Sequence, residues 1–330
     1  MKPLAGHVAV VAGATRGAGR GIACMLGEAG AIVYCTGRSV QGQASEIGRR
    51  ETIEETAALV TELGGRGVWV QVDHREVDQV RSLFERVRAE QGRLDILVNT
   101  MSGDHYLTPG MLSGQEPIPF WDYPIEKGLA IQQNGLHTHM VSSFFAAAQM
   151  VKRRQGLIVE VNDGNALQYN DVGVYYSLSK TAIVLLAYLM AEEMKAYNVT
   201  VVSLTPGWLR SERMLDSFGV TEDNWQDALA QAPDFAKSET PFYIGRAVVA
   251  LATDERVGER TGHALSAGYL AREYGFTDVD GRQPPGYFPE GMFQKGYFVP
   301  AKDAAIDEQS WGQYLCSLVA KRDGQGPNQV

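Results

Sequence analysis

The amino-acid sequence predicts a doubly wound α/β fold, in which helices cover both faces of a single parallel β-sheet. Short apolar runs, beginning with Val8 to Ala12, alternate along the chain with longer stretches of helical spacing. Glycine or polar residues follow the first six of these runs, at the strand ends where ligands of such sheets lie. With 330 residues and 45% hydrophobic content, the chain is interpreted as a single domain, residues 1–330.

The expected strands are apolar enough to be parallel strands buried on both faces. They are Val8–Ala12, Ile32–Cys35, Gly67–Val72, Leu94–Val98, Leu157–Val161, Val199–Leu204 and His263–Ser266. Helices are expected between them, and Val77–Gln91 shows the pattern, because its apolar residues recur every three or four positions. The other expected helices are Ile22–Glu28, Thr52–Leu63, Pro124–Lys152, Val174–Tyr197 and Pro241–Ala252.

Three stretches are expected to elaborate a core of about residues 5–270. The Gly- and Pro-rich segment from Thr100 to Tyr123 is too long for a simple connection and is interpreted as a wall of the substrate site. Polar residues at about 208–240 follow a strand end and are interpreted as a lid. The C-terminal extension, about 271–330, is expected to pack on the body or on a neighbouring subunit.

Composition favours a small-molecule substrate. The net charge of −9 without a basic block argues against nucleic acid or an anionic membrane as the main partner. Three cysteines without CxxC spacing indicate a reducing compartment, and the longest apolar run, Ala182 to Met190, is too short to span a membrane. A cytoplasmic protein is expected, without a signal peptide. His137 and His139 lie two apart on a helix, which disfavours a metal site.

A glycine-rich loop follows the first strand and predicts dinucleotide binding. Gly13, Gly17 and Gly19 have the spacing GxxxGxG and precede a helix. Glycines let a diphosphate approach the backbone, where the N–H groups and the positive end of the helix dipole hold the anion. The alternative is a mobile turn.

The end of the second strand indicates which nicotinamide cofactor binds. An NAD site usually carries an acid there, whereas this chain has Arg38 and Ser39, with Arg16 in the glycine loop. A ribose 2′-phosphate matches arginine, so NADP(H) is predicted. The alternative is that both arginines are solvated surface residues. Asp73, after the third strand, is expected either to reach the adenine or to cap the next helix, near Arg75.

Tyr176 and Lys180 are four residues apart at the start of a helix, so their side chains share one face. The lysine ammonium favours the phenolate, and such a tyrosine can exchange a proton with a carbonyl or alcohol oxygen. Tyr123 and Lys127 have the same spacing, but Tyr123 precedes Pro124 in a loop.

These motifs together resemble the short-chain dehydrogenase/reductase family over roughly residues 7–268. The matching segments are AGATRGAG at 12–19, Thr36-Gly37-Arg38, Asp73, DILVN at 95–99, YSLSK at 176–180 and Pro206-Gly207. The resemblance implies a Rossmann-type three-layer sandwich, a catalytic tyrosine tuned by the lysine, and a homo-oligomer, as a dimer or tetramer. The cofactor-binding residues that it implies are Gly13, Thr15, Arg16, Gly17, Gly19, Arg38, Ser39, Asp73, Asn99, Tyr176, Lys180, Pro206 and Gly207.

The chain departs from the family pattern in the catalytic residues. Where the family has a serine, thirteen residues before the tyrosine, this chain has Asp163, and an ionised carboxylate cannot donate to a carbonyl oxygen. Either Asp163 is protonated by burial, or the substrate brings a donor or a positive charge. The family's catalytic asparagine aligns with Gly135, and Asn134 could serve if the helix is irregular. The usual NNAG after the fourth strand is reduced to a single match at Asn99.

The leading hypothesis is an NADPH-dependent oxidoreductase that acts on a carbonyl, or on the alcohol in reverse, with Tyr176 as acid/base. Asp163 motivates a variant of it, reduction of an imine, iminium or amino-ketone. The altered serine and asparagine positions motivate the rival, a sensor that binds NADP(H) without turnover.

Overall fold

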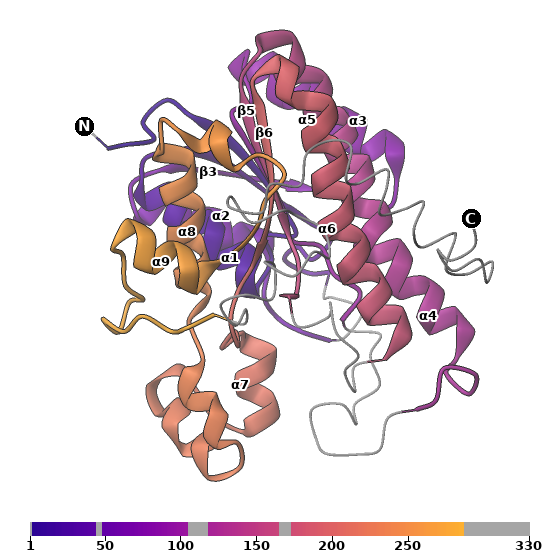
Figure 1. The fold of residues 1–330 in the computed structure, drawn as a ribbon, viewed down its shortest axis with the longest axis vertical. Coiled ribbons are helices and arrows are strands. Elements are labelled where there is room, and N and C mark those ends of the chain that lie inside the picture. Colours follow the sequence, from indigo (N-terminus) through magenta and orange to yellow (C-terminus); the bar gives the residue numbers. More distant parts are fainter. Residues whose placement is uncertain (1, 44–47, 105–117, 165–172, 287–330) are drawn as a thin grey trace, which may run out of the picture. The chain divides into compact units, whose positions relative to one another are not determined.

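The computed structural model describes residues 2–43, 48–104, 118–164 and 173–286, and residues 1–288 form one compact unit (Figure 1). Seven parallel strands form one sheet in the order β3-β2-β1-β4-β5-β6-β7. The strands are β1 Val8–Ala12, β2 Ile32–Gly37, β3 Arg66–Gln71, β4 Ile96–Asn99, β5 Gly156–Val161, β6 Val199–Thr205 and β7 Ala264–Ser266. The doubly wound sheet predicted from the sequence is confirmed.

Helices pack on both faces of the sheet, which gives three layers (Figure 1). One face is covered by α1 Gly17–Glu28, α2 Ile53–Glu62, α8 Pro241–Thr253 and α9 Ala267–Tyr274. The other face is covered by α3 Val77–Gln91, α5 Thr138–Arg153 and α6 Val174–Met194. Six of the strands are almost entirely buried between these layers, and that burial explains their apolar runs. The edge strand β3 is partly exposed, and its Trp69 side chain is 50% exposed. Helix α9 was not among the expected elements.

The long helix expected over Pro124–Lys152 is interrupted. Helix α4, Ile125–Gln132, passes into a π-helical turn at Gln133–His137 before α5 begins. At this turn the chain runs against α6, because a Cβ atom on Gly135 would overlap the hydroxyl oxygen of Ser179. A side chain at this position would have to displace the Ser179 hydroxyl, and π turns of this kind are frequent at functional sites.

The predicted lid is a small unit with its own apolar cluster. Helix α7, Glu212–Phe218, is followed by 3₁₀ segments at Glu222–Ala230 and Pro233–Lys237, which lie beyond the sheet in Figure 1. Its buried side chains are Val220, Trp225, Ala228 and Phe235. The guanidinium of Arg210 lies 4.4 Å from the Trp225 ring centroid and donates to the Ser238 carbonyl oxygen. Arg210 thus joins the beginning of this segment to Ser238 near its end, and the role of the segment as a lid stays a prediction.

The described part of the C-terminal extension packs on the body. The Asp278 carboxylate accepts hydrogen bonds from the backbone and hydroxyl of Thr240, just before α8, and the Tyr243 hydroxyl donates to the Pro284 carbonyl oxygen. The remainder of the extension, residues 287–330, lies outside the described residues, as do positions 105–117 of the predicted substrate wall.

Within the described ranges, one helical segment, Val174–Tyr197, is long and apolar enough to cross a membrane by length and composition. It contains α6, which packs against β5 and β6. We therefore interpret α6 as a core helix of the sandwich. Its candidate catalytic residues Tyr176 and Lys180 are buried. The cytoplasmic location stays a prediction from the sequence.

Candidate active site

The glycine-rich loop connects β1 to α1 in a tight turn. The backbone N–H groups of Gly13 and Ala14 both donate to the Thr36 carbonyl oxygen at the end of β2. Gly13 has a φ of +89°, and a Cβ atom on Gly19 would overlap the Gly13 carbonyl oxygen. Glycine is therefore required at both positions, and the loop brings its backbone close to the start of α1 without side chains in the way.

The N-terminus of α1 already holds an anionic group from the lid. The Gly17 N–H donates to Oε2 of Glu212, the first residue of α7, at 2.8 Å. The Cβ of Ser211 would lie 3.5 Å from a Cβ placed on Gly17. A carboxylate at this point indicates that the loop and helix dipole accept a negative charge, as a diphosphate site must.

At the end of β2, arginines and glutamates form a cluster. The Arg16 Nε lies 3.4 Å from the Glu51 carboxylate, which Arg49 also contacts at 2.6 Å. Burial lowers the pKa of Arg16, and the Glu51 charge opposes that shift. Arg16 is thus half-buried and paired rather than a solvated surface residue. Arg38 follows the strand, and its carbonyl oxygen accepts from the Gln71 side chain.

Asp73 follows β3 and pairs with a nearby arginine. Its carboxylate lies 2.6 Å from Arg75 Nη2 and accepts the Arg75 backbone N–H. Burial acts to raise the pKa of Asp73, but these hydrogen bonds outweigh it and hold the pKa below its usual value. Helix α3 has Glu76 as its N-cap, so Asp73 closes the turn before the helix rather than capping it. Its contact with adenine stays a prediction.

The catalytic candidates lie together where β5 ends and α6 begins. The Tyr176 hydroxyl donates to Asp163 Oδ2 at 2.8 Å, and both Tyr176 and Lys180 are only 7% exposed. The Lys180 ammonium lies 5.3 Å from the Tyr176 ring centroid and 3.6 Å from the Asp104 carboxylate. A phenol is therefore held between a lysine cation and a carboxylate, an arrangement suited to moving a proton.

Comparison with known proteins agrees with this geometry. The sequence profile described as short chain dehydrogenase matches residues 7–218. The mouse protein called dehydrogenase/reductase SDR family member 1 is 39% identical over 294 residues, which cover 88% of this chain and 89% of that protein. The chain belongs to the short-chain dehydrogenase/reductase family. Members of this family are oxidoreductases that use a nicotinamide cofactor, NAD or NADP, and act on small-molecule substrates.

Two solved structures are similar to this short-chain dehydrogenase/reductase in fold. A short-chain type dehydrogenase/reductase from Mycobacterium marinum superposes with a TM-score of 0.64 at 23% identity, covering 81% of this chain and 96% of that one. A putative short-chain alcohol dehydrogenase from Sinorhizobium meliloti 1021 gives a TM-score of 0.63 at 27% identity, covering 81% and 98%. Both support the sandwich architecture.

The two asparagines predicted for the site of this family member have structural contacts. Asn134 lies in the π turn, so the expected helix irregularity is present, and its amide donates to the Ala130 carbonyl oxygen. The Asn99 amide nitrogen donates to Ser143 and to the Glu160 carboxylate. The roles of both asparagines in binding or catalysis stay predictions.

A buried hydrogen-bond network supports the loop after β4, and the sequence analysis missed it. Glu160 of β5 and His139 of α5 are fully buried, with 2.6 Å between the Glu160 Oε2 and His139 Nδ1 atoms. The other ring nitrogen of His139 lies 2.9 Å from the Met101 carbonyl oxygen. The signal was a single acid within the apolar run LIVEV at 157–161.

Pro206-Gly207, expected among the cofactor-binding residues, adjoins a second buried acid that sequence reasoning missed. The Gly207 N–H donates to Glu239 Oε2 at 2.9 Å. Glu239 is fully buried at the end of the lid, and its Oε1 atom has no hydrogen-bond partner within the described residues. Burial raises the pKa of Glu239 to about 8, although the Gly207 hydrogen bond opposes the shift.

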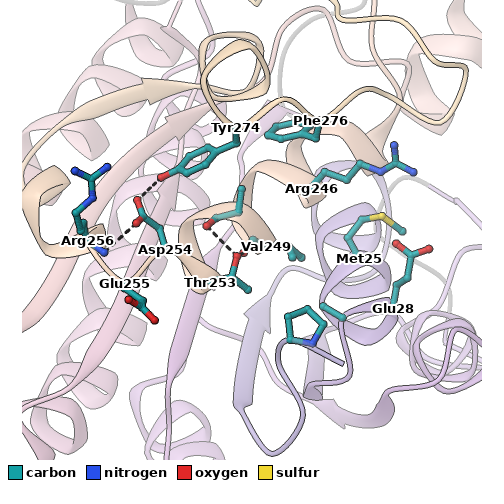
Figure 2. A pocket seen from close by; sticks show the side chains of 13 residues that line it. Met25, Glu28, Arg246, Val249, Thr253, Asp254, Glu255, Arg256, Tyr274 and Phe276 are labelled. Atoms are coloured by element: carbon teal, nitrogen blue, oxygen red, sulfur yellow. Dashed lines mark hydrogen bonds between the residues drawn. The ribbon is translucent and has the colours of Figure 1, made fainter. Parts of the chain in front are cut away.

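A cavity of about 750 Å³ lies between the C-terminal halves of α1 and α8, and none of the predicted site residues lines it. Figure 2 shows the α1 side chains Met25 and Glu28 and the aromatic rings of Tyr274 and Phe276 around it.

Among the described residues, no group of three His, Cys, Asp or Glu side chains is arranged to hold a metal ion.

Proposed function

We propose that the chain is an NADPH-dependent oxidoreductase that reduces a carbonyl group, or oxidises the alcohol in reverse. The observation that carries this proposal is the Tyr176 hydroxyl, held with the Lys180 side chain on one face of α6 and hydrogen-bonded to Asp163 at the end of β5. The cofactor supplies hydride when it is bound. The protein's own contribution is the proton at the Tyr176 oxygen.

The glycine loop fits a dinucleotide. Gly13 and Gly19 leave no room for side chains, and the start of α1 holds a carboxylate in place of a phosphate. Arg38 and Ser39 stand after β2, where an NAD site usually has an acid, and Arg16 stands in the glycine loop. A 2′-phosphate with two negative charges is a better partner for this arginine cluster than a ribose hydroxyl.

Tyr176 acts as the general acid in reduction. The Lys180 ammonium favours the phenolate and so lets the phenol give up its proton more readily. Asp163 favours the protonated phenol, because a carboxylate can only accept the hydrogen bond. Tyr176 therefore lies between two opposing charges, and the substrate oxygen takes the proton as negative charge develops on it.

A second candidate substrate class follows from the same hydrogen bond. Asp163 brings a negative charge to the place where the family's serine stands, next to the reacting atoms. A substrate with an iminium or ammonium group would be stabilised there, whereas a neutral ketone would not. Reduction of imines or amino-ketones is therefore the alternative to reduction of neutral carbonyl compounds.

The test compares Tyr176→Phe with Tyr188→Phe, a tyrosine further along α6, in NADPH oxidation with neutral carbonyl compounds and cyclic imines. Loss of the proton donor should lower turnover by about 10²–10⁴-fold in Tyr176→Phe alone. NADPH affinity, followed by fluorescence titration, should be nearly unchanged, and NADH should bind more weakly. Turnover that survives in Tyr176→Phe would disprove the acid/base role.

The same panel separates the substrate classes. If Asp163 serves a cationic substrate, Asp163→Ser should slow imines and leave neutral carbonyl compounds equal or faster. Equal effects on both classes count against the second candidate. NADPH binding without oxidation by any substrate in the panel would instead favour the sensor.

We also propose a homo-oligomer, formed through exposed apolar side chains on α5 and α6. Phe144, Leu178 and Leu189 are 69%, 58% and 52% exposed. Large apolar side chains exposed on neighbouring helices are unfavourable in water, and a second copy can cover them by two-fold symmetry. Light scattering should give the mass of a dimer or tetramer, and a monomer at micromolar concentration would contradict it.

A further inference from the structure

Helix α7 of the lid reaches into the region proposed for the cofactor. Besides its contact with Gly17, the Glu212 carboxylate lies 4.0 Å from Arg20 Nε of α1. Further along α7, Asp216 Oδ2 lies 2.6 Å from Arg49 Nη1 in the arginine cluster after β2. Two acids of α7 thus contact the start of α1, where the proposed diphosphate would lie, and the arginine cluster near it.

The same helix also contacts the catalytic side. Arg213 donates to the Asp104 carbonyl oxygen at 2.9 Å, and the Asp104 carboxylate faces Lys180. Helix α7 is therefore tied to the glycine loop through Glu212 and to the loop after β4 through Arg213. A ligand that displaces Glu212 therefore acts on a helix that also contacts the loop on the catalytic side.

The first-turn N–H groups of α1 cannot hold two anions at one place. Glu212 takes the Gly17 N–H, and its side chain is 26% exposed, so it can move away into solvent. A diphosphate at the same helix end brings more negative charge and repels a carboxylate that stays. We propose that Glu212 competes with the diphosphate of the cofactor for the N-terminus of α1 and so sets cofactor affinity. This inference rests on the proposed function, because it assumes that a dinucleotide binds there.

The size of the effect follows from the interaction of an anion with a helix N-terminus. Such an interaction changes binding by about three- to thirtyfold when it is partly buried. Removing the Glu212 charge should therefore tighten binding of any ligand whose diphosphate needs this position. A ligand without a diphosphate should gain nothing.

The experiment measures dissociation constants of the full-length protein by titration calorimetry. Glu212→Gln keeps the size of the side chain and removes its charge, and Asp223→Asn removes a charge from an exposed lid position as the matched control. The probes are NADPH, 2′-phospho-ADP-ribose and adenosine 2′-monophosphate, of which the last lacks the diphosphate. We expect Glu212→Gln to bind the first two about three- to thirtyfold more tightly and the third like the wild type.

Unchanged or weaker binding of NADPH and 2′-phospho-ADP-ribose to Glu212→Gln would overturn the competition. Glu212→Ala, which also removes the hydrogen-bond acceptor, should tighten binding at least as much, and weaker binding by both variants refutes the proposal. An equal gain for adenosine 2′-monophosphate would show a general charge effect and refute it as well. If neither the wild type nor any variant binds a diphosphate-containing probe, the proposed function itself fails.

Discussion

Two buried polar regions flank the carboxyl edge of the sheet, and they differ in how completely their acids are hydrogen-bonded. Between the sheet and α5, the Glu160 carboxylate receives hydrogen bonds from Ser143 and Asn99 and contacts His139. The second region is the lid base, where Gly207 and Glu239 meet at the two ends of the lid segment. Among the described residues, the Glu239 carboxylate accepts a hydrogen bond only from the Gly207 N–H, and its second oxygen has no partner.

The difference indicates that one region is a scaffold and that the other can exchange a proton. His74, in the α5 region, has both ring nitrogens 2.8 Å from hydroxyl oxygens, of Thr36 and Ser142. Burial lowers the pKa of His74 to about 4, so it is neutral at pH 7. Glu239, whose pKa is raised to about 8, is mostly protonated at pH 7 and loses its proton in mildly alkaline solution. His74 thus keeps one protonation state near neutral pH, whereas Glu239 at the lid base responds to pH.

The largest effect that this comparison predicts is on stability in the α5 region. Glu160→Ala leaves the donors of Ser143 and Asn99, and the imidazole of His139, buried without their acceptor. Each buried group left without a partner costs about 1–3 kcal/mol, so the loss of one acceptor shared by three partners should cost about 3–5 kcal/mol in all. Urea unfolding should show this as a lower midpoint with an unchanged slope.

The matched control is Glu192→Gln. It removes an exposed acid of α6 that pairs with Lys195, just after the helix. A surface pair of this kind contributes at most about 0.5 kcal/mol. If Glu160→Ala unfolds within about 1 kcal/mol of the wild type, the α5 network does not support the sheet edge, and the contrast with the lid base is lost.

Much of the fold could be predicted because it depends on local patterns. The bounds of α3 were predicted exactly as Val77–Gln91, since its apolar residues have a clear helical spacing and Gly92 ends it with a positive φ. The seven strands were found because they are short apolar runs in a parallel sheet. Tyr176 and Lys180 could be paired because a single helix fixes their relation.

The contacts between distant segments could not be predicted in this way. Glu160 stands out in an apolar strand, but its partner His139 depends on the π turn that shifts α5 relative to α4. In the sequence, Glu212 is an ordinary first-turn acid after the N-cap Ser211. Only the fold brings it into contact with Gly17, 195 residues away in sequence. Helix α9 follows a very short strand in a Gly- and Pro-rich stretch, so its local signal was weak.

A smaller effect is predicted at the lid base, where it depends on pH. The pKa of Glu239 is raised from 4.5 to about 8, first by burial and further by Asp278, while Arg210 and the Gly207 N–H oppose the shift. Between these two values the folded protein holds a proton that the unfolded chain has released. The free energy of unfolding therefore falls as pH rises through this window, and this contribution levels off above about pH 8.

Glu239→Gln removes that proton equilibrium and keeps the size of the side chain. From pH 5.5 to 7.5, the wild type should lose about 2 kcal/mol of unfolding free energy relative to the variant, measured by urea unfolding at several pH values. The amide can still accept the Gly207 N–H, so the lid base should stay folded at every pH in the series. Wild-type and variant curves that run parallel across this range would mean that Glu239 is charged in the folded protein. The lid base would then need a hydrogen-bond partner for the second Glu239 oxygen and would resemble the α5 region instead.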